Sequence, residues 1–301
     1  MKKAVVSFIV PALNEERNIR DTFDTIRVNV PFDTLDYEII FVDGGSEDRT
    51  VQIAHFLAQG DPRIKIYAEG GIGGFGDAFK KGVSLAHGDF LMLVPGDNEV
   101  SGEAIRAILS EAGSADMIIP YFTNQEIRPP ARRMLSRLFV LILNSITGYR
   151  LRYYNGTVLY RSHQLKGYGI RTNGFAFQAE CVIHLLSNGS TFKEVGTKIQ
   201  HRGSGRTKAF SARNLTSVSA FILRLIARYR FGRGRAVHYG TGRVQQRGRT
   251  RGRTGETALP PLDIPPEINY IAAFLTFSCN LKCPYCINNC LLYTSPSPRD
   301  S

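Results

Sequence analysis

The sequence predicts an α/β domain in which helices flank a mostly parallel central sheet. Across residues 1–122, short apolar runs alternate with segments of helical spacing, which favours β-α-β units with right-handed crossovers. The run Phe90–Val94 is continuously apolar, as expected of a strand buried on both faces. Further strands are expected at Val5–Pro11, Tyr37–Asp43, Ile64–Ala68 and Met117–Tyr121, and helices at Asn14–Val28, Glu47–Leu57, Phe75–Ala86, Ala131–Ile146 and Arg213–Tyr229.

The composition is that of a globular protein, but the positive charge is confined to one segment. The 301 residues carry a formal net charge of +12 at pH 7. Ten arginines lie between residues 224 and 253, in a stretch without lysine or acidic residues, so the basicity belongs to that stretch and not to the fold. No apolar run is long enough to cross a membrane, and the N-terminal run ends at Pro11 without a cleavage site. We therefore expect a cytoplasmic protein.

Polar and acidic residues follow the predicted strands, at the edge where open parallel sheets bind ligands. Asp43 ends one strand and can accept hydrogen bonds from a base or a ribose. Asp97 and Glu99 stand two residues apart after another strand, so both carboxylates can face one divalent cation on a diphosphate. Taken alone, the Asp-Gly-Gly-Ser at 43–46 is also the sequence of an ordinary turn and helix cap. The glycine-rich segment 70–76 lacks the Lys-Ser/Thr of a P-loop.

An ordered set of sequence blocks is more specific than any block alone. The blocks are Val10-Pro11-Ala12-Leu13-Asn14-Glu15, Glu38-Ile39-Ile40-Phe41-Val42-Asp43-Gly44-Gly45-Ser46-Glu47-Asp48, Gly73-Gly74-Phe75-Gly76-Asp77-Ala78, Phe177-Gln178-Ala179-Glu180 and Arg202-Gly203-Ser204-Gly205-Arg206-Thr207-Lys208. In this order they resemble the family 2 glycosyltransferases of the GT-A fold, and most closely the dolichol-phosphate mannose synthase-like branch. The resemblance covers roughly residues 4–230 and implies a Rossmann-like GT-A domain over residues 1–230.

The resemblance also implies a donor site and a metal site. A nucleotide-sugar donor would be bound by residues of four blocks: Pro11, Asn14, Glu15, Asp43, Gly45, Ser46, Gly74, Gln178 and Glu180. Asp97 and Glu99 would hold Mg²⁺ or Mn²⁺, with Asp97 catalytic, and Arg202 and Lys208 would meet phosphate charge as further catalytic residues. The family's aspartate-any-aspartate triplet reads Pro95-Gly96-Asp97 here. Its first carboxylate is missing, and Glu99 is the residue placed to compensate.

The implied reaction is transfer of a hexose from a nucleoside diphosphate-sugar with inversion at the anomeric carbon. A lipid phosphate acceptor is already anionic and needs little help from a base, for which Glu180 is a weak candidate. The predicted helices 131–146 and 213–229 combine apolar faces with arginines, which fits interfacial helices as well as helices that cover a sheet. In the resembled branch such helices lie on the membrane. This favours a polyprenyl-phosphate acceptor and peripheral contact with the inner face of the cell membrane, with a soluble acceptor as the alternative.

Three further segments are predicted beyond the transferase domain, in residues 231–301. Residues 231–266 are rich in glycine, arginine and proline and are expected to be a disordered linker. Residues 267–290 hold Cys279, Cys283 and Cys286 after an apolar run, which resembles the first strand and [4Fe–4S] loop of radical S-adenosylmethionine enzymes. A zinc site completed by Cys290, or unpaired thiols, are the alternatives. A barrel of that class needs on the order of 200 residues, so a truncated fragment is expected, and residues 291–301 look like translated adapter sequence.

The tract Arg247–Arg253 supports a rival hypothesis, a protein that binds RNA or an anionic surface through arginines. No aromatic residue lies between residues 240 and 269, so the base stacking typical of such RNA-binding tracts has no side chain to supply it. Nor does the tract explain the ordered blocks in residues 4–208. The sequence therefore favours a glycosyltransferase and disfavours nucleic acid as a partner.

Overall fold

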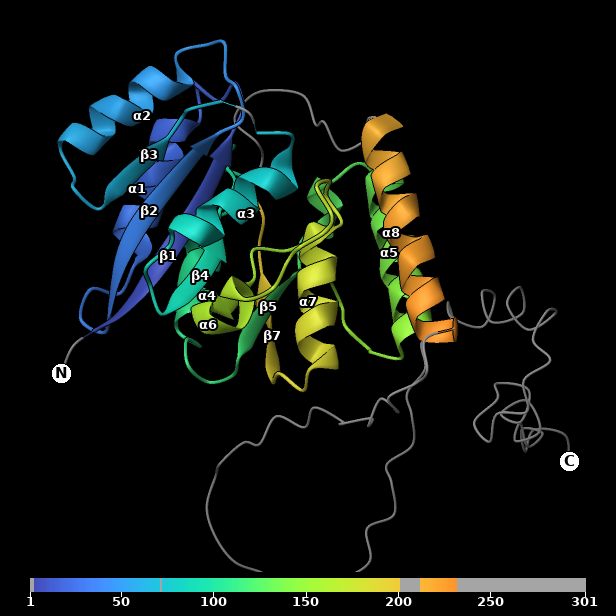
Figure 1. Ribbon diagram of the computed structural model, residues 1–301. Helices are drawn as coiled ribbons and strands as arrows, with labels where there is room; N and C mark the ends of the chain where they lie inside the picture. The colour runs from blue at the N-terminus through green and yellow to red at the C-terminus, as the bar shows by residue number, and fades with distance from the viewer. Residues whose placement is uncertain (1–2, 71, 201–211, 232–301) are drawn as a thin grey trace, which may run out of the picture. The chain divides into compact units, whose positions relative to one another are not determined.

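Seven strands of the described chain form one sheet with the order β3-β2-β1-β4-β6-β5-β7 (Figure 1). The computed structural model describes residues 3–70, 72–200 and 212–231. Strand β6 runs antiparallel to β4 and β5, and the other neighbouring pairs are parallel, so the predicted mostly parallel sheet is confirmed. The strands are β1 (Ala4–Ala12), β2 (Leu35–Asp43), β3 (Ile64–Tyr67), β4 (Phe90–Leu93), β5 (Met117–Phe122), β6 (Leu159–Arg161) and β7 (Phe192–Thr197).

Helices cover both faces of this sheet. They are α1 (Ile19–Asn29), α2 (Thr50–Gln59), α3 (Phe75–Leu85), α4 (Gly102–Leu109), α5 (Pro130–Thr147), α6 (Ser162–Lys166), α7 (Phe177–Ser187) and α8 (Ala212–Phe231), with a 3₁₀ turn at Gln125–Ile127. Along β1, Phe8 and Val10 pack in an apolar cluster with α1, α2 and α4, whereas Ile9 packs in a second cluster with α3, α7 and α8. This alternation follows from the period of two in a strand, which sends successive side chains to opposite faces.

The first helix begins later than the sequence predicts. Helical spacing starts at Asn14, but α1 begins at Ile19. Asn14 has a φ of 57°, in the left-handed region, and the Glu15 carbonyl accepts hydrogen bonds from the Asn18 and Ile19 amides at 2.9 Å each. Residues 14–18 therefore form a turn at the end of β1, which leaves these polar residues at the sheet edge instead of on a helix face.

Helices α5 and α8 pack on each other and are amphipathic, as predicted. On α8, Phe221 and Leu225 are buried, whereas Leu223 is 66% exposed. On α5, Leu143 is buried and Met134 is 71% exposed. Exposed apolar side chains gather on α5, where Leu135 and Leu138 accompany Met134, and Leu223 is the exposed large apolar side chain among the described residues of α8. No helix in the described part of the chain is long and apolar enough to span a membrane.

Several predictions concern positions outside the described residues. These are Arg202 and Lys208, the linker at 231–266 beyond Phe231, the cysteine-containing segment 267–290 with its iron–sulfur and S-adenosylmethionine assignment, and the segment 291–301. The predicted domain boundaries therefore stay predictions.

Candidate active site at the carboxyl edge of the sheet

The candidate site lies where the strand order reverses, between β1 and β4. Open α/β sheets bind ligands at such a point, outside the carboxyl ends of the strands. Strand β1 and the segment that follows β4 stay paired beyond the end of β4. The Val94 amide donates to the Ile9 carbonyl at 2.9 Å, and the Gly96 amide donates to the Pro11 carbonyl at 3.0 Å. A Cβ at position 96 would lie 2.9 Å from the Ala12 Cβ, so the close approach requires glycine there. This pairing fixes the loop that carries Asp97.

The loops after β1 and β2 are tied together by reciprocal hydrogen bonds. The Asn14 amide donates to Ser46 Oγ at 2.9 Å, and the Glu47 amide donates to Asn14 Oδ1 at 2.8 Å. The Glu15 amide donates to Thr50 Oγ1 at 2.8 Å. The structure therefore brings the predicted residues Pro11, Asn14, Glu15 and Ser46 together with Asp43, with the polar side chains of Asn14 and Ser46 joining the two loops.

Asp43 combines burial with an unused acceptor. Its side chain is at the last position of β2 and only 4% exposed. Oδ2 accepts hydrogen bonds from the Gly45 amide at 2.9 Å and the Ser46 amide at 3.0 Å, whereas Oδ1 is buried without a hydrogen-bond partner among the described residues. Gly45 has a φ of 92°, which favours glycine and lets the loop fold back onto the carboxylate. A buried acceptor without a partner is costly, so an N–H or O–H donor from a ligand would stabilise this arrangement.

The carboxylate of Glu99 faces two arginines that sequence reasoning did not connect with it. Asp97 Oδ1 accepts a hydrogen bond from the Glu99 amide at 3.2 Å. Glu99 Oε2 lies 3.9 Å from Arg128 Nη2 and 3.8 Å from Arg132 Nη2. The Arg128 guanidinium also stacks over the Phe122 ring at 4.5 Å. The basic start of the predicted helix 131–146 was the available signal, but it pointed to a membrane surface and not to Glu99.

This donor set is compatible with Mg²⁺ or Mn²⁺ provided that a substrate supplies further oxygens. Among the described residues there is no group of three or more His, Cys, Asp or Glu side chains that could hold a metal ion. Mg²⁺, however, is commonly bound by one or two carboxylates together with substrate phosphates and water. Asp97 fits that pattern. Glu99 would have to exchange its contacts with Arg128 and Arg132 for the cation.

Gln178 and Glu180 lie in the first turn of α7. Both are buried, and the Glu180 carboxylate is already occupied by hydrogen bonds within the protein. Glu180 Oε1 accepts hydrogen bonds from Tyr168 Oη and the Arg171 amide, each at 2.9 Å, and Oε2 accepts from the Thr172 amide at 2.8 Å. Burial favours the neutral acid, but the hydrogen bonds from Thr172, Arg171 and Tyr168 outweigh it, and the pKa of Glu180 lies below its ordinary value. A carboxylate held in this way is a poor general base.

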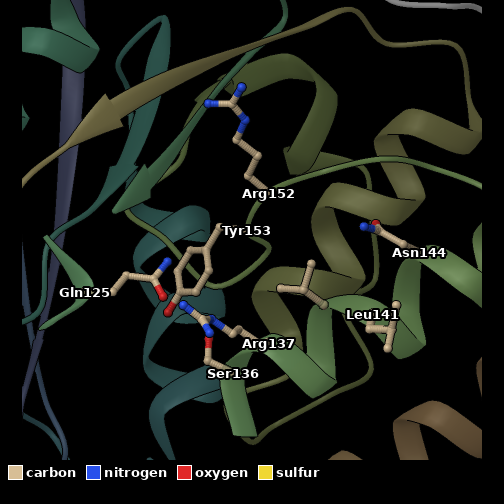
Figure 2. Close-up of a pocket in the computed structure, with 8 residues that line it drawn as sticks. Gln125, Ser136, Arg137, Leu141, Asn144, Arg152 and Tyr153 are labelled. Atoms are coloured by element: carbon tan, nitrogen blue, oxygen red, sulfur yellow. The ribbon is translucent and has the colours of Figure 1, made fainter. Parts of the chain in front are cut away.

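A cavity of about 230 Å³ adjoins this edge beside α5. Figure 2 shows the side chains of Gln125, Tyr153 and Arg137 gathered together, with Leu141 and Asn144 on α5. Tyr153 Oη accepts a hydrogen bond from Arg128 Nη1 at 3.1 Å, which connects the cavity wall to the arginine that faces Glu99. The lining residues are Gln125, Ser136, Arg137, Val140, Leu141, Asn144, Arg152 and Tyr153. The cavity lining thus combines two arginines, Arg137 and Arg152, with the apolar side chains of Val140 and Leu141.

A family model, glycosyl transferase family 2, matches residues 7–168, and the chain belongs to this family. The chain is 33% identical over 108 residues to the uncharacterized glycosyltransferase EpsJ of Bacillus subtilis (strain 168), covering 36% of this chain and 30% of EpsJ. It is 25% identical over 147 residues to the prophage bactoprenol glucosyl transferase homolog of Escherichia coli (strain K12), covering 48% of each. The matched region thus spans 30% and 48% of the length of these two relatives.

Solved structures of glucosyl-3-phosphoglycerate synthase from Mycobacterium tuberculosis share the fold. The complex with Mn²⁺, uridine diphosphate (UDP) and glucosyl-3-phosphoglycerate matches with a TM-score of 0.51 and 18% identity, over 74% of this chain and 79% of that chain. The complex with Mg²⁺ and UDP matches with a TM-score of 0.56 and 16% identity, over 74% and 79% of the two chains. At these identities the likeness shows the fold alone, and it confirms the predicted GT-A-like architecture.

Proposed function

We propose that this chain transfers a sugar from a nucleoside diphosphate-sugar at the carboxyl edge of its sheet, with a divalent cation on the diphosphate. The observation that carries the proposal is the buried Asp43 Oδ1, an unused acceptor at the carboxyl end of β2, the strand beside β1, where the strand order reverses toward β4. Asp43 ends β2 and Asp97 follows β4, so both lie at the carboxyl edge of the sheet. The Mn²⁺, Mg²⁺ and UDP complexes of the structural neighbours support this choice of ligand.

Eight of the nine predicted donor-site residues contact or surround the nucleotide in this proposal, and Glu180 does not, because backbone amides and Tyr168 occupy its carboxylate. Asp43 Oδ1 accepts a hydrogen bond from the base or ribose, while Asn14 and Ser46 hold the two loops that surround it. The remaining positions, Pro11, Glu15, Gly45, Gly74 and Gln178, shape the walls around the nucleotide. Asp97 holds Mg²⁺ or Mn²⁺, with Glu99 as the second candidate ligand. When bound, such a cation acts as a Lewis acid for the negative charge that grows on the leaving diphosphate.

The proposed acceptor is a polyprenyl phosphate, as in the dolichol-phosphate mannose synthase-like branch. The bactoprenol glucosyl transferase relatives support it by name. In the structure, the cavity beside α5 offers Arg137 and Arg152 for a phosphate and Val140 and Leu141 for an isoprenoid chain. An oxygen of the acceptor phosphate attacks the anomeric carbon as the bond to the diphosphate oxygen breaks, and the electron pair leaves with the nucleoside diphosphate. Configuration is inverted.

The proposed acceptor needs little help from a general base, and the surface of the helices beside the cavity suits binding of the protein to a membrane. The attacking phosphate oxygen is already anionic near pH 7, so orientation carries much of the rate. Arg202 and Lys208 remain the candidates to meet phosphate charge. The exposed apolar side chain of Met134 lies on α5, which lines the cavity, and that of Leu223 lies on α8, which packs on α5; both suit contact with lipid. The acceptor would then reach the site from the bilayer surface while the protein stays peripheral.

A radiolabelled transfer assay tests this proposal. The full chain is incubated with UDP-glucose or GDP-mannose, Mn²⁺, and either undecaprenyl phosphate in detergent or 3-phosphoglycerate. The expected result is a labelled lipid that requires the polyprenyl phosphate and is lost with EDTA. Transfer to 3-phosphoglycerate alone would replace the lipid acceptor by a soluble one. Failure of both nucleotide-sugars, together with no thermal stabilisation by UDP or GDP, would contradict the proposed activity itself.

A further inference from the structure

We propose that Glu180 is a positioning residue that holds the chain segment 171–174 against the first turn of α3 and thereby shapes the donor side of the site. The inference rests on the proposed function, because it assigns a role in binding the nucleotide-sugar. It gives Glu180 neither a ligand nor a proton to transfer.

Both oxygens of the Glu180 carboxylate accept hydrogen bonds from the segment that precedes α7. Both Oε atoms accept hydrogen bonds from consecutive backbone amides, those of Arg171 and Thr172, at 2.9 and 2.8 Å. Tyr168 Oη donates a third, at 2.9 Å. Glu180 itself is 9% exposed. Two adjacent amides on one buried carboxylate fix the local backbone direction, because charge-assisted hydrogen bonds are the stronger kind and are lost together when the charge is removed.

The same segment is in contact with the first turn of α3. The Gly76 amide donates to the Asn173 carbonyl at 2.9 Å. A Cβ at position 76 would lie 2.8 Å from both the Thr172 and Asn173 carbonyl oxygens, and one at position 74 would lie 3.2 Å from the latter. The ring of Phe75 also lies 5.6 Å from that of Phe177. Gly76 is therefore required by the close approach of segment 171–174, and a side chain at position 74 would be tight against the same segment.

The first turn of α3 belongs to the donor side by its place in the sheet. Tyr67, at the end of β3, pairs with Val42, the neighbour of Asp43. Because α3 connects the parallel strands β3 and β4, its first residues lie at the carboxyl edge, as Asp43 and Asp97 do. Displacement of segment 171–174 would move Gly74 and Phe75 at this edge. Glu180 thus acts on the donor site through the segment that it holds.

Helix α8 supports the same segment from outside. Arg224 Nη2 donates to Thr172 Oγ1 at 3.1 Å. Thr172 is 2% exposed, and its side chain also forms a hydrogen bond with Glu180. Thr172 is therefore hydrogen-bonded to Glu180 of α7 and to Arg224 of α8. A change at Arg224 should loosen the segment in the same direction as a change at Glu180, but less, because it removes one contact and leaves both backbone amides paired.

The test combines amide exchange with donor kinetics in Glu180→Gln. The glutamine keeps the shape but replaces one acceptor oxygen by an NH₂ group that faces a backbone amide. We expect hydrogen exchange in a peptide covering residues 168–176 to become about tenfold faster or more, since hydrogen bonds to a charged group are worth 10- to 100-fold. The KM for UDP-glucose should rise about tenfold, while kcat stays within about threefold, because no reacting group is lost.

Glu38→Gln is the matched control. Glu38 is another buried glutamate with several donors, at the opposite edge of the sheet. It should melt at a lower temperature without changing either the exchange of the 168–176 peptide or the donor KM. Arg224→Gln should accelerate exchange in that peptide by a smaller factor than Glu180→Gln.

Three outcomes would contradict the inference in distinguishable ways. Unchanged exchange at residues 168–176 would show that Glu180 does not hold the segment. Faster exchange with an unchanged donor KM would show a structural role alone. A large loss of kcat with the acidic limb of the pH profile removed and the donor KM unchanged would make Glu180 the general base. The exchange measurement needs no nucleotide, so absence of donor binding in the wild-type chain would instead overturn the proposed function and the donor-site role with it.

Discussion

The two ends of strand β2 carry buried carboxylates that are treated in opposite ways. Toward the amino end, Glu38 accepts hydrogen bonds from Ser7 Oγ, the His87 amide and Lys65 Nζ at 2.6 Å each. At the carboxyl end, Asp43 uses one oxygen for its own turn and leaves the other buried without a partner. A fold has no structural use for such an acceptor. The comparison separates a carboxylate that holds the sheet together from one with an unused acceptor, which we propose is available to a ligand.

Backbone conformation shows the same asymmetry. Within the described residues, Asn14 and Asn98 are the non-glycine residues with positive φ, at 57° and 55°. Both lie on loops of the carboxyl edge, Asn14 after β1 and Asn98 after β4. Such conformations cost free energy and persist where the surroundings hold them, often at binding sites. The cross-loop hydrogen bonds of Asn14 are what hold it here.

The largest effect is expected for Asp97→Asn. Loss of this carboxylate removes the proposed cation ligand, so transfer should fall by about 100- to 1,000-fold, as when a group that stabilises developing charge is removed. The melting temperature should barely change, because Asp97 lies on a loop and not in the apolar clusters. Radiolabelled transfer and thermal unfolding measure the two effects. Full activity of the variant would remove Asp97 from the metal site.

Asp43→Asn tests whether the unused acceptor at the carboxyl end of β2 binds a ligand. One amide oxygen can still accept from the Gly45 and Ser46 amides, but an NH₂ group then replaces the unused acceptor. The affinity for UDP should fall by about 10- to 100-fold, the value of a hydrogen bond to a charged group. Isothermal titration measures it. A variant that binds UDP as tightly as the wild type would show that Oδ1 is not a ligand acceptor.

Glu38→Gln breaks the comparison at the other end. The substitution leaves donors from Ser7, His87 and Lys65 facing an amide, so the free energy of unfolding should fall by about 1–3 kcal/mol. UDP affinity should stay unchanged, because the residue lies away from the ligand edge. Urea denaturation and isothermal titration give the two numbers. A parallel loss of both would mean that the two ends of the strand are not independent.

The pH dependence of stability sharpens the same contrast. Burial favours the neutral form of Glu38, but hydrogen bonds from Lys65, Ser7 and the His87 amide outweigh it and lower its pKa below the ordinary 4.5. A lowered folded-state pKa means a contribution that is complete above pH 4.5 and is lost as pH falls through the lowered pKa. The stability difference between wild type and Glu38→Gln should therefore be constant near pH 7 and shrink below pH 4.5. Urea denaturation curves across this range measure it, and a difference that stays constant throughout would contradict the assignment.

The smallest effect is expected for Glu99→Gln. Its ion pairs with Arg128 and Arg132 are long and partly exposed, at 3.9 and 3.8 Å, and such pairs contribute little. Transfer should fall by less than about tenfold, and the salt dependence of the reaction should change because two guanidinium groups are released. Initial rates between low and high salt check this. A loss as large as that of Asp97→Asn would make Glu99 a principal cation ligand.

Sequence reasoning succeeded where one short segment specifies the structure. Continuous apolar runs gave the parallel strands, and strand-end residues such as Asp43 and Asp97 could be placed at one edge from chain direction alone. It failed where distant residues meet. The contact of Glu99 with Arg128 joins residues on different loops, and no local pattern encodes it. Glu180 has the appearance of a ligand in sequence, but its partners are backbone amides, which carry no sequence signature. The sequence likewise does not show that Asn14 adopts a left-handed backbone conformation, which is why residues predicted to start a helix form a turn instead.

Isothermal titration of UDP into the full chain, with and without Mn²⁺, tests the central claim most directly. If the carboxyl edge binds a nucleoside diphosphate through a cation at Asp97, the wild type should bind UDP at least about tenfold more tightly with Mn²⁺ than without, a difference of about 1.4 kcal/mol. Asp97→Asn should lose this dependence, and Glu38→Gln should keep it. Equal binding with and without Mn²⁺ in the wild type, or an unchanged Mn²⁺ dependence in Asp97→Asn, would contradict the account.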